Sequence, residues 1–448
     1  MPKVGFVSLG CPKNLVDSEV MLGTLARQGY TITPRKEDAD VIVVNTCGFI
    51  DSAKKESIDT ILEMADLKAQ GNCKKLVVAG CLAERYRNEI QKEIPEIDFI
   101  FGPDELGRVL EAVHLDSFST AAVPDVSIDA LYTSKEVPTI PRILTTPSYM
   151  AYLKISEGCD HVCTFCAIPG FRGRFRSRSV ADLVAESRRL AEQGVRELVI
   201  VSQDTMAYGK DLGLADGITI LLRELVKIDG LKWVRFLYCY PNMVSEGLVR
   251  LVAEEDRLCK YFDIPYQHAS RPVLDRMKRG GNRDTYERQV ESIRKYIPDA
   301  GVRTSFIVGF PGESDNDFNE LLSFTRNVRF DNVGVFLYSD EEGTAAFDLD
   351  RKVTRAIATR RRNRLMKEQS RISADRLERM VGRKVEVLLE GPSEESDLLL
   401  QGRMETQAPD IDGHVLINDA GEKKVAPGEF YTVEITESLD YDLIGKII

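Results

Sequence analysis

Short apolar segments alternate with longer amphipathic segments along most of this chain, and no other feature limits its possible folds so strongly. A first series covers residues 3–113, where the stretches between apolar runs repeat with the period of a helix. Strands that alternate with crossover helices form a parallel sheet with helices on both faces. The sequence therefore predicts an α/β fold that begins with a doubly wound parallel sheet in a domain of residues 1–120. The strands expected in this sheet are Lys3–Leu9, Val41–Thr46, Leu76–Ala79 and Phe99–Phe101.

A second alternating series follows residues 121–147, whose prolines and lack of periodicity indicate a linker. We assign this series to a domain of residues 148–376, in which six strands with intervening helices favour a βα-barrel, partial or complete. The helix expected over residues 351–376 has ten Lys and Arg against two Asp and Glu, which is most simply a solvent-facing charged surface. The six strands are Met150–Ile155, Glu197–Val201, Val234–Tyr240, Phe262–Pro265, Arg303–Val308 and Asn332–Leu337.

The last part of the chain, residues 377–448, has a different pattern, in which short strands are separated by turns. Turn signals occur at residues 390–392 (EGP) and 412–413 (DG). This pattern predicts a small antiparallel β-barrel. Its expected strands are Lys384–Leu389, Leu398–Met404, His414–Ile417 and Phe430–Ile435.

Three cysteines, Cys159, Cys163 and Cys166, lie close together just after the first strand of the second series. Cysteine thiolates are the usual ligands of iron–sulfur clusters, and three of them leave one iron of a 4Fe–4S cube open to a small molecule. A zinc site is the alternative, but it needs a fourth ligand such as His161, and this spacing is uncommon for zinc. The triplet therefore predicts a 4Fe–4S cluster at the carboxyl end of a barrel strand, where barrel active sites are built.

The CxxxCxxC segment resembles the cluster loop of the radical S-adenosylmethionine (SAM) superfamily, in which an aromatic residue, here Phe165, precedes the last cysteine. The resemblance implies that the open iron binds SAM, which is cleaved to a 5′-deoxyadenosyl radical. Residues 305–313 (SFIVGFPGE) resemble the segment that packs against the adenosine of SAM in this superfamily. Phe165, Gly309, Gly312 and Glu313 are accordingly expected to bind the cofactor.

Three further cysteines, Cys11, Cys47 and Cys81, are distant in sequence, but each directly follows a strand of the predicted N-terminal sheet. The carboxyl ends of parallel strands meet at one edge of a sheet, and open α/β sheets bind their ligands there. The alternative is three unrelated core cysteines, since free cysteine is among the most buried residues. Three equivalent strand ends favour a second iron–sulfur cluster with an open iron.

This combination of domains resembles the methylthiotransferases over essentially the full chain, with the C-terminal barrel in the place of their TRAM domain. The resemblance implies two 4Fe–4S clusters and SAM as cofactors. In that family the second cluster handles the sulfur, one SAM provides the methyl group and another provides the radical. Because a radical removes the hydrogen, we assign no general acid or base, and catalytic side chains stay unknown. The three remaining cysteines, Cys73, Cys239 and Cys259, are expected to be structural.

Two observations favour the branch of this family that acts on an aspartate of ribosomal protein S-twelve over the branches that act on tRNA adenosines. Residues 8–19 (SLGCPKNLVDSE) resemble the ribosomal-protein branch. Residues 377–448 carry seven Lys and Arg against sixteen Asp and Glu, a net charge of −9. Such a domain disfavours RNA, whose phosphates are bound by basic groups, and suits a basic partner. A tRNA enzyme that uses the basic helix of residues 351–376 remains the alternative.

The composition of the whole chain limits its location and its class. Its net charge is −11, and its nine cysteines occur without a secretory signal or a long apolar segment. A disulfide framework and a membrane location are therefore disfavoured, and the cytoplasm is expected. A rival of another class is a non-catalytic iron–sulfur carrier, which would bind iron without cleaving SAM. The sequence identifies neither the sulfur source nor the electron donor.

Overall fold

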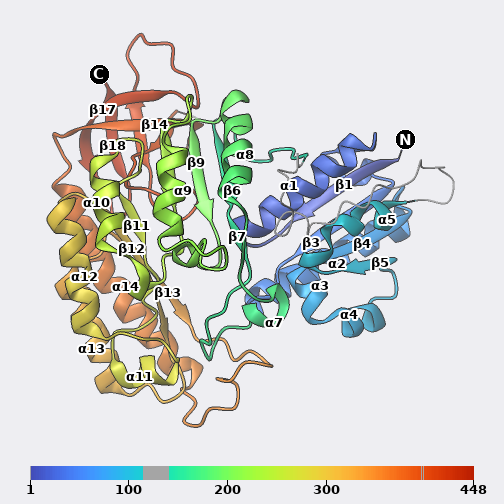
Figure 1. Cartoon of the computed structure of the whole chain (residues 1–448), viewed down its shortest axis with the longest axis horizontal. Helices are drawn as coiled ribbons and strands as arrows, with labels where there is room; N and C mark the ends of the chain where they lie inside the picture. Colours follow the sequence, from blue (N-terminus) through green and yellow to red (C-terminus); the bar gives the residue numbers. More distant parts are fainter. Residues whose placement is uncertain (1, 115–140, 395, 397) are drawn as a thin grey trace.

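The computed structural model describes residues 2–114, 141–394, 396 and 398–448 (Figure 1). Most of the expected linker, including Pro124 and Pro138, lies outside the described residues. The N-terminal sheet has five strands, all parallel, in the order β2-β1-β3-β4-β5. The chain goes from β1 to β2 on one side and then returns past β1 to β3 on the other side. This change of direction leaves a crevice outside the carboxyl ends of β1 and β3, where open α/β sheets bind their ligands. The strands are β1 (Lys3–Ser8), β2 (Thr31–Thr33), β3 (Val41–Thr46), β4 (Lys75–Gly80) and β5 (Phe99–Phe101).

Helices cover both faces of this sheet, so the expected doubly wound architecture is confirmed. One face packs against α1 (Pro12–Arg27) and α5 (Val109–Val113). The other packs against α2 (Asp51–Gln70) and α4 (Arg87–Glu93). The short helix α3 (Cys81–Arg85) begins directly after β4. The strand β2 was not expected, because three residues with partly exposed side chains give little periodic signal.

The central domain contains the six expected strands as two three-stranded parallel sheets, β10-β9-β6 and β11-β12-β13. A bridge from Val234 of β10 to Leu258, three residues before β11, links the two sheets. Among the described residues β6 and β13 do not pair, so the barrel is partial and its wall is open. The strands are β6 (Met150–Lys154), β9 (Glu197–Val201), β10 (Trp233–Phe236), β11 (Tyr261–Asp263), β12 (Gly301–Val308) and β13 (Asn332–Leu337).

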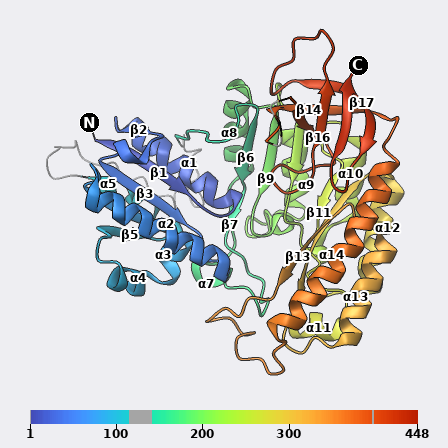
Figure 2. The ribbon, with the colours of Figure 1, turned by 180° about the vertical axis from the view of Figure 1, so that it is seen from behind.

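Helices line the outer side of this wall, and Figure 2 shows α12, α13 and α14 along one flank. The basic helix α14 (Arg355–Glu378) packs on β13 and α13 through residues spaced three or four apart, including Ala358, Leu365 and Ile372. Four of its arginines, Arg355, Arg360, Arg364 and Arg371, are exposed, whereas Arg361 is buried and Arg376 pairs with Asp331. The other helices of the domain are α7 (Ile168–Arg172), α8 (Val180–Glu192), α9 (Gly217–Leu225), α10 (Glu246–Glu254), α11 (Arg271–Arg276), α12 (Arg283–Tyr296) and α13 (Asp315–Val328).

The C-terminal domain is a closed five-stranded barrel in the order β14-β15-β16-β18-β17. Four strands correspond to the expected ones, and the fifth, β18, inserts between β16 and β17. That position makes β18 parallel to β16, so the barrel is antiparallel at every pairing except this one. The strands are β14 (Lys384–Pro392), β15 (Leu400–Arg403), β16 (Val415–Asp419), β17 (Phe430–Ser438) and β18 (Leu443–Ile447).

Packing between the domains fixes the position of the candidate site. Helix α1 of the N-terminal domain contacts β6 of the central domain. The C-terminal barrel shares an apolar cluster with the central strands that includes Trp233, Tyr261 and Leu388. None of the helices in the described ranges combines the length and the apolar character that a membrane crossing requires.

Candidate active site

The N-terminal cysteine set, Cys11, Cys47 and Cys81, comes together at the carboxyl edge of the sheet, as expected from the strand ends. Cys11 stands just before α1, Cys47 follows β3 and Cys81 opens α3. Gly10 has a φ of +89°, and a Cβ atom there would lie 3.0 Å from the Sγ of Cys47. Only glycine combines this backbone with so close an approach. The crowding therefore explains the glycine beside Cys11.

The charges around this set differ from one thiol to the next. Burial acts to raise the pKa of Cys11, but the nearby Lys13 ammonium and Arg172 guanidinium lower that pKa overall. Burial raises the pKa of Cys81 to about 12 despite Arg172, and the neighbouring Cys11 and Cys47 raise it further. These mutual effects arise because the three thiols are close enough to feel each other's charge.

The loop cysteine set, Cys159, Cys163 and Cys166, lies between two short strands that pair with each other, β7 (Ser156–Glu157) and β8 (Arg176–Ser177). The amide of Cys159 donates to the carbonyl of Gly173 at 3.2 Å, and that of Cys166 to the carbonyl of Cys163 at 3.1 Å. Burial raises the pKa of Cys159 to about 11 and that of Cys166 to about 12. The loop is thus held by its own backbone.

His161, the candidate fourth ligand of a zinc site, is held by two neighbours. Its ring stacks on Tyr240 with centroids 3.8 Å apart, and its Nε2 lies 2.6 Å from Oδ2 of Asp204. Among the described residues, however, His161 and the loop cysteines do not form a group placed to hold one metal ion, so a zinc site is disfavoured.

The expected SAM segment lies beside the loop cysteine set. Phe165 packs with Phe310, Val273 and Met277 in one apolar cluster, which joins the cysteine loop to the turn after β12. Glu313 is buried, and its carboxylate accepts from the amides of its own turn, including that of Phe310 at 3.2 Å. The structure thus brings Phe165 and the turn of residues 309–313 together.

Packing accounts for both glycines of that turn. Gly309 has a φ of +79°, and a Cβ there would lie 2.4 Å from the Cβ of Ala358 on α14. Gly312 has a φ of +88°, and its Cβ would lie 2.7 Å from Nε of Arg276. The absence of side chains here therefore lets the turn seat against the protein. Contact of these residues with SAM stays a prediction.

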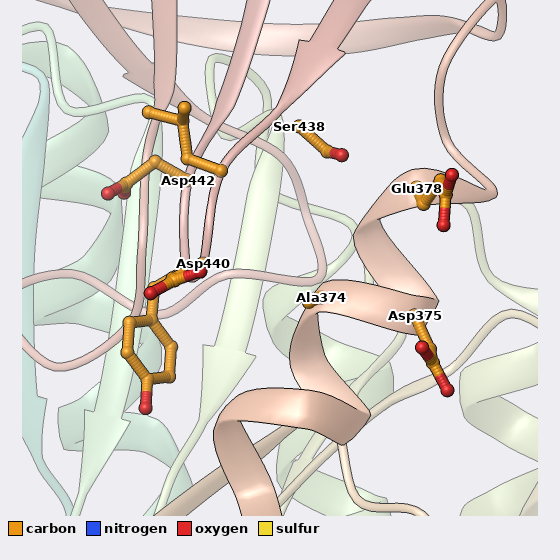
Figure 3. Close-up of a pocket in the computed structure, with 8 residues that line it drawn as sticks. Ala374, Asp375, Glu378, Ser438, Asp440 and Asp442 are labelled. Carbon is orange, nitrogen blue, oxygen red and sulfur yellow. The ribbon is translucent and has the colours of Figure 1, made fainter. Parts of the chain in front are cut away.

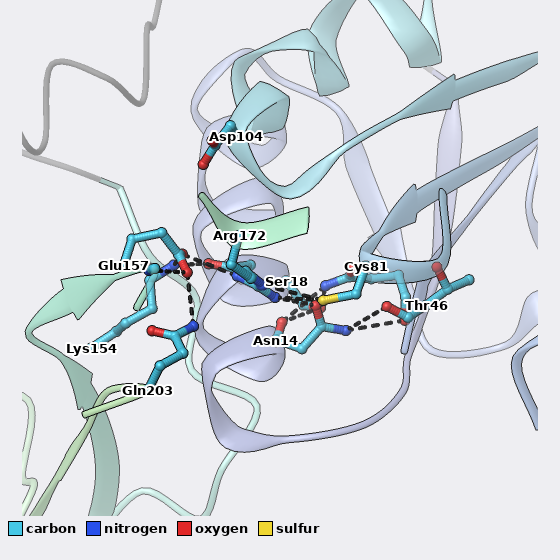
Figure 4. Close-up of polar contacts among 12 residues, drawn as sticks. Asn14, Ser18, Thr46, Cys81, Asp104, Lys154, Glu157, Arg172 and Gln203 are labelled. Carbon is cyan, nitrogen blue, oxygen red and sulfur yellow. Dashed lines mark hydrogen bonds and ion pairs between the residues drawn. The ribbon is translucent and has the colours of Figure 1, made fainter. Parts of the chain in front are cut away.

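Figure 4 shows Arg172 between Cys81 of the N-terminal cysteine set and Glu157, which precedes the loop cysteine set. Its Nε and one Nη donate to the Sγ of Cys81 at 3.2 and 3.1 Å, and the other Nη donates to Glu157 at 3.0 Å. Glu157 stands two residues before Cys159, and Lys154 and Gln203 also donate to its carboxylate, each at 2.8 Å. Lys154 and Arg172 hold the pKa of Glu157 at about 2 in spite of its burial.

The donor sets fit iron–sulfur clusters better than a single ion. Among the described residues no three His, Cys, Asp or Glu side chains are placed to hold one metal ion. In a cube each thiolate binds a different iron, so its ligands stand further apart. Because burial raises the pKa of Cys81, a bare thiol there would stay protonated, yet Arg172 donates to its sulfur. Arg279 likewise donates to the Sγ of Cys163 at 3.4 Å. Cationic donors at sulfur suit thiolates that a metal keeps deprotonated.

Sequence reasoning did not identify Arg172, Tyr240, Asp204 or Arg279. Residues 172–178 carry four arginines, of which Arg172 and Arg178 are both buried in ion pairs. The signal available was the density of arginines directly after a cysteine loop. The three cysteines expected to be structural, Cys73, Cys239 and Cys259, lie in hydrophobic cores.

Three family models match the chain, in the order of its domains. Residues 3–102 match Uncharacterized protein family UPF0004, residues 153–325 the Radical SAM superfamily and residues 381–448 the TRAM domain.

Two relatives, from Koribacter versatilis (strain Ellin345) and Solibacter usitatus (strain Ellin6076), are each called ribosomal protein uS12 methylthiotransferase RimO. Each is 50% identical, over 100% of this chain and 96% or 95% of the relative.

A solved structure shares the fold at lower similarity. The radical S-adenosylmethionine methyltransferase TsrM from Kitasatospora setae, with cobalamin and a 4Fe–4S cluster bound, superimposes with a TM-score of 0.53 at 16% identity. The match covers 75% of each chain.

Proposed function

The chain belongs to the ribosomal protein uS12 methylthiotransferase family, and from this premise we propose that it inserts sulfur at, and methylates, the β-carbon of an aspartate in ribosomal protein S-twelve. The observation that carries the proposal is the link from Cys81 of the N-terminal cysteine set through Arg172 to Glu157, two residues before the loop cysteine set. Sulfur insertion needs a group that removes hydrogen and also a place that holds the sulfur. Two cysteine sets at one domain interface meet both needs.

Membership of the radical SAM superfamily implies SAM and one 4Fe–4S cluster as cofactors. Together they supply a carbon radical able to remove hydrogen from an unactivated C–H bond. We assign this cluster to the loop cysteine set, with Phe165, Gly309, Gly312 and Glu313 on the SAM side. We assign a second 4Fe–4S cluster to the N-terminal cysteine set, where the sulfur would be held.

Within this proposal the protein's own residues position and insulate the reacting groups. The Glu157 carboxylate, ionised and buried, anchors Lys154 and Arg172 between the two sets. Tyr240 stacks on His161, and Phe165 closes the apolar side of the cysteine loop. These contacts hold the loop in one conformation, which suits radical chemistry, in which side reactions must be suppressed.

The C-terminal domain supports a protein substrate. Its net charge of −9 repels phosphates and attracts a basic partner, and ribosomal proteins are typically basic. Carboxylates also line a cavity of about 560 Å³ between the end of α14 and the segment from β17 to β18, among them Asp375, Glu378, Asp440 and Asp442 (Figure 3). A ribosomal substrate places the enzyme in the cytoplasm.

The second candidate is a tRNA methylthiotransferase, which one feature favours. Arg360, Arg364, Lys367 and Arg371 of α14 are exposed and could contact phosphates. The acidic barrel borders this helix, however, and would oppose RNA bound along it. We therefore rank the protein substrate first.

Mass spectrometry separates the two candidates. The reconstituted enzyme, with SAM, reductant and sulfide, is incubated with S-twelve, with the small ribosomal subunit or with tRNA. We expect the added methylthio mass on the aspartate of S-twelve, whereas the same addition on tRNA alone would overturn the proposal. A non-catalytic iron–sulfur carrier would give no 5′-deoxyadenosine in any mixture.

Cysteine variants test the two sets separately. Cys159→Ala should abolish formation of 5′-deoxyadenosine, because the SAM-binding cluster is lost. Cys11→Ala should retain SAM cleavage but stop methylthiolation. Cys73→Ala removes a buried thiol outside both sets and should change neither reaction. Methylthiolation by the Cys11 variant would contradict the role of the second cluster.

A further inference from the structure

Arg172 makes more contacts than its ion pairs with carboxylates explain. Its five N–H donors are all used, two on the Sγ of Cys81 and one each on Asn14, Asp17 and Glu157. The side chain is 2% exposed and lies at the end of α7, so it reaches from the central domain into the N-terminal domain. One edge of its guanidinium faces sulfur, and the other faces carboxylates.

The sulfur contacts are the unusual part of this arrangement. Lys154 already pairs with both Asp17 and Glu157, so the two carboxylates have a cation without Arg172. A buried guanidinium aimed at a neutral thiol would gain little from two of its donors. Against a thiolate the same donors form charge-assisted hydrogen bonds, which are about twice as strong as neutral ones.

We propose that Arg172 is a positioning residue for the sulfur-holding cluster, and that its two hydrogen bonds to Cys81 raise the reduction potential of that cluster. The ion pair between Arg172 and Glu157 ties the cluster to the loop cysteine set. This inference rests on the proposed function, because it requires the second cluster. Hydrogen bonds to the ligand sulfurs are among the factors that set the potential of an iron–sulfur cluster. A cationic donor stabilises the reduced state, which carries one more negative charge.

The contact to Glu157 gives the same residue a second consequence. Glu157 also accepts from the amide of Gly158, which is adjacent to Cys159. The path from Cys81 through Arg172 and Glu157 to the loop cysteine set therefore consists of buried side chains and no flexible segment. The two clusters would be held at one separation.

Redox titration of the second cluster tests the inference. The full chain with Cys159, Cys163 and Cys166 replaced by Ala retains the N-terminal cysteine set, so its electron paramagnetic resonance signal reports that cluster alone. In this background Arg172→Gln should lower the ratio of reduced to oxidised cluster at a fixed potential about tenfold, a shift of about 59 mV for one electron. Arg172→Lys keeps the charge but has three donors for five contacts, and should shift the ratio in the same direction by less.

The matched control is Arg142, which also joins the domains. Its side chain is 6% exposed and pairs with Glu19 of α1 and Glu186 of α8, and no sulfur atom in the described part of the chain contacts it. Arg142→Lys should therefore leave the potential unchanged. If Arg172→Gln does not accumulate as folded protein, Arg172→Lys carries the same test.

The outcomes separate the inference from the proposed function. A cluster whose potential is the same in the Arg172 variants and in their parent overturns the inference alone. A parent protein that binds no cluster in the N-terminal cysteine set overturns the second cluster of the proposed function, and the inference with it. A shift in the Arg172 variants without a shift in the Arg142 variant supports both.

Discussion

Arg403 of the C-terminal barrel donates to Oε2 of Glu197 in the central sheet at 2.6 Å, and both side chains are completely buried. Arg235 donates to the other oxygen of Glu197 at 2.8 Å. The carboxylate is thus shared between two strands of the central sheet and the barrel that packs on their edge. This is the polar centre of the interface between the two domains.

Removing the charge of Glu197 should weaken that interface strongly. Glu197→Gln leaves the buried Arg235 without a carboxylate and Arg403 with Glu390 alone, and the loss of one partner of a buried ion pair costs about 3–5 kcal/mol. We expect the urea concentration at which half of the protein has its C-terminal barrel separated from the central domain to be clearly lower in this variant. The control is Glu429→Gln, which breaks an exposed pair with Arg196 across the same two domains and should cost about 0–1 kcal/mol. Equal midpoints for the two variants would contradict this role of Glu197.

The same carboxylate makes the interface sensitive to acid. Burial opposes ionisation of Glu197, but Arg403 and Arg235 outweigh it and hold its pKa at about 2. In the unfolded chain the pKa of Glu is about 4.3, so the stabilisation is complete above that pH and is lost as the pH falls toward 2. The difference in unfolding midpoint between the wild type and Glu197→Gln should therefore shrink between pH 6 and pH 3. A constant difference over that range would show that Glu197 does not titrate with folding.

The glycine beside Cys11 should be required for the second cluster and not for SAM cleavage. A Cβ at Gly10 would lie 2.7 Å from the Cβ of Cys47, so Gly10→Ala must push apart two of the expected ligands. Reconstituted protein should fall from about eight irons to about four per chain, with 5′-deoxyadenosine still formed. Gly213→Ala is the control, because Gly213 also has a positive φ but meets nothing within 4 Å. An unchanged iron content in Gly10→Ala would exclude the steric argument.

The regular pattern of the chain predicted most of this architecture. The convergence of Cys11, Cys47 and Cys81 followed from a single rule, that parallel strands end at one edge. The same reasoning did not find β2, whose three side chains are all at least partly exposed, or β18, whose sequence LIGKI does not alternate apolar and polar residues.

Buried charge was the harder part to predict. Arg172 and Arg174 are two residues apart in one basic run, yet the first is buried against Cys81 and the second is exposed. Charge density in a sequence does not distinguish them, since burial depends on a partner from a different domain. The partners of Arg172 are 15 to 158 residues away along the chain.

Gly309 allows packing and cofactor binding to be separated by experiment. Its Cβ would meet the Cβ of Ala358 at 2.4 Å, so Gly309→Ala should cost about 1–3 kcal/mol through overpacking, besides the strain of its positive φ. Ala358→Gly alone should cost about 1 kcal/mol as a glycine in a helix. Because it also removes the clashing atom, the double variant should be more stable than the sum of the single changes predicts, by about 1–2 kcal/mol. Thermal unfolding and SAM binding by equilibrium dialysis measure both quantities in all four proteins. If SAM binding recovers together with stability, packing against α14 explains the glycine; if stability recovers while SAM binding stays lost, the bare backbone at Gly309 is needed by the cofactor itself.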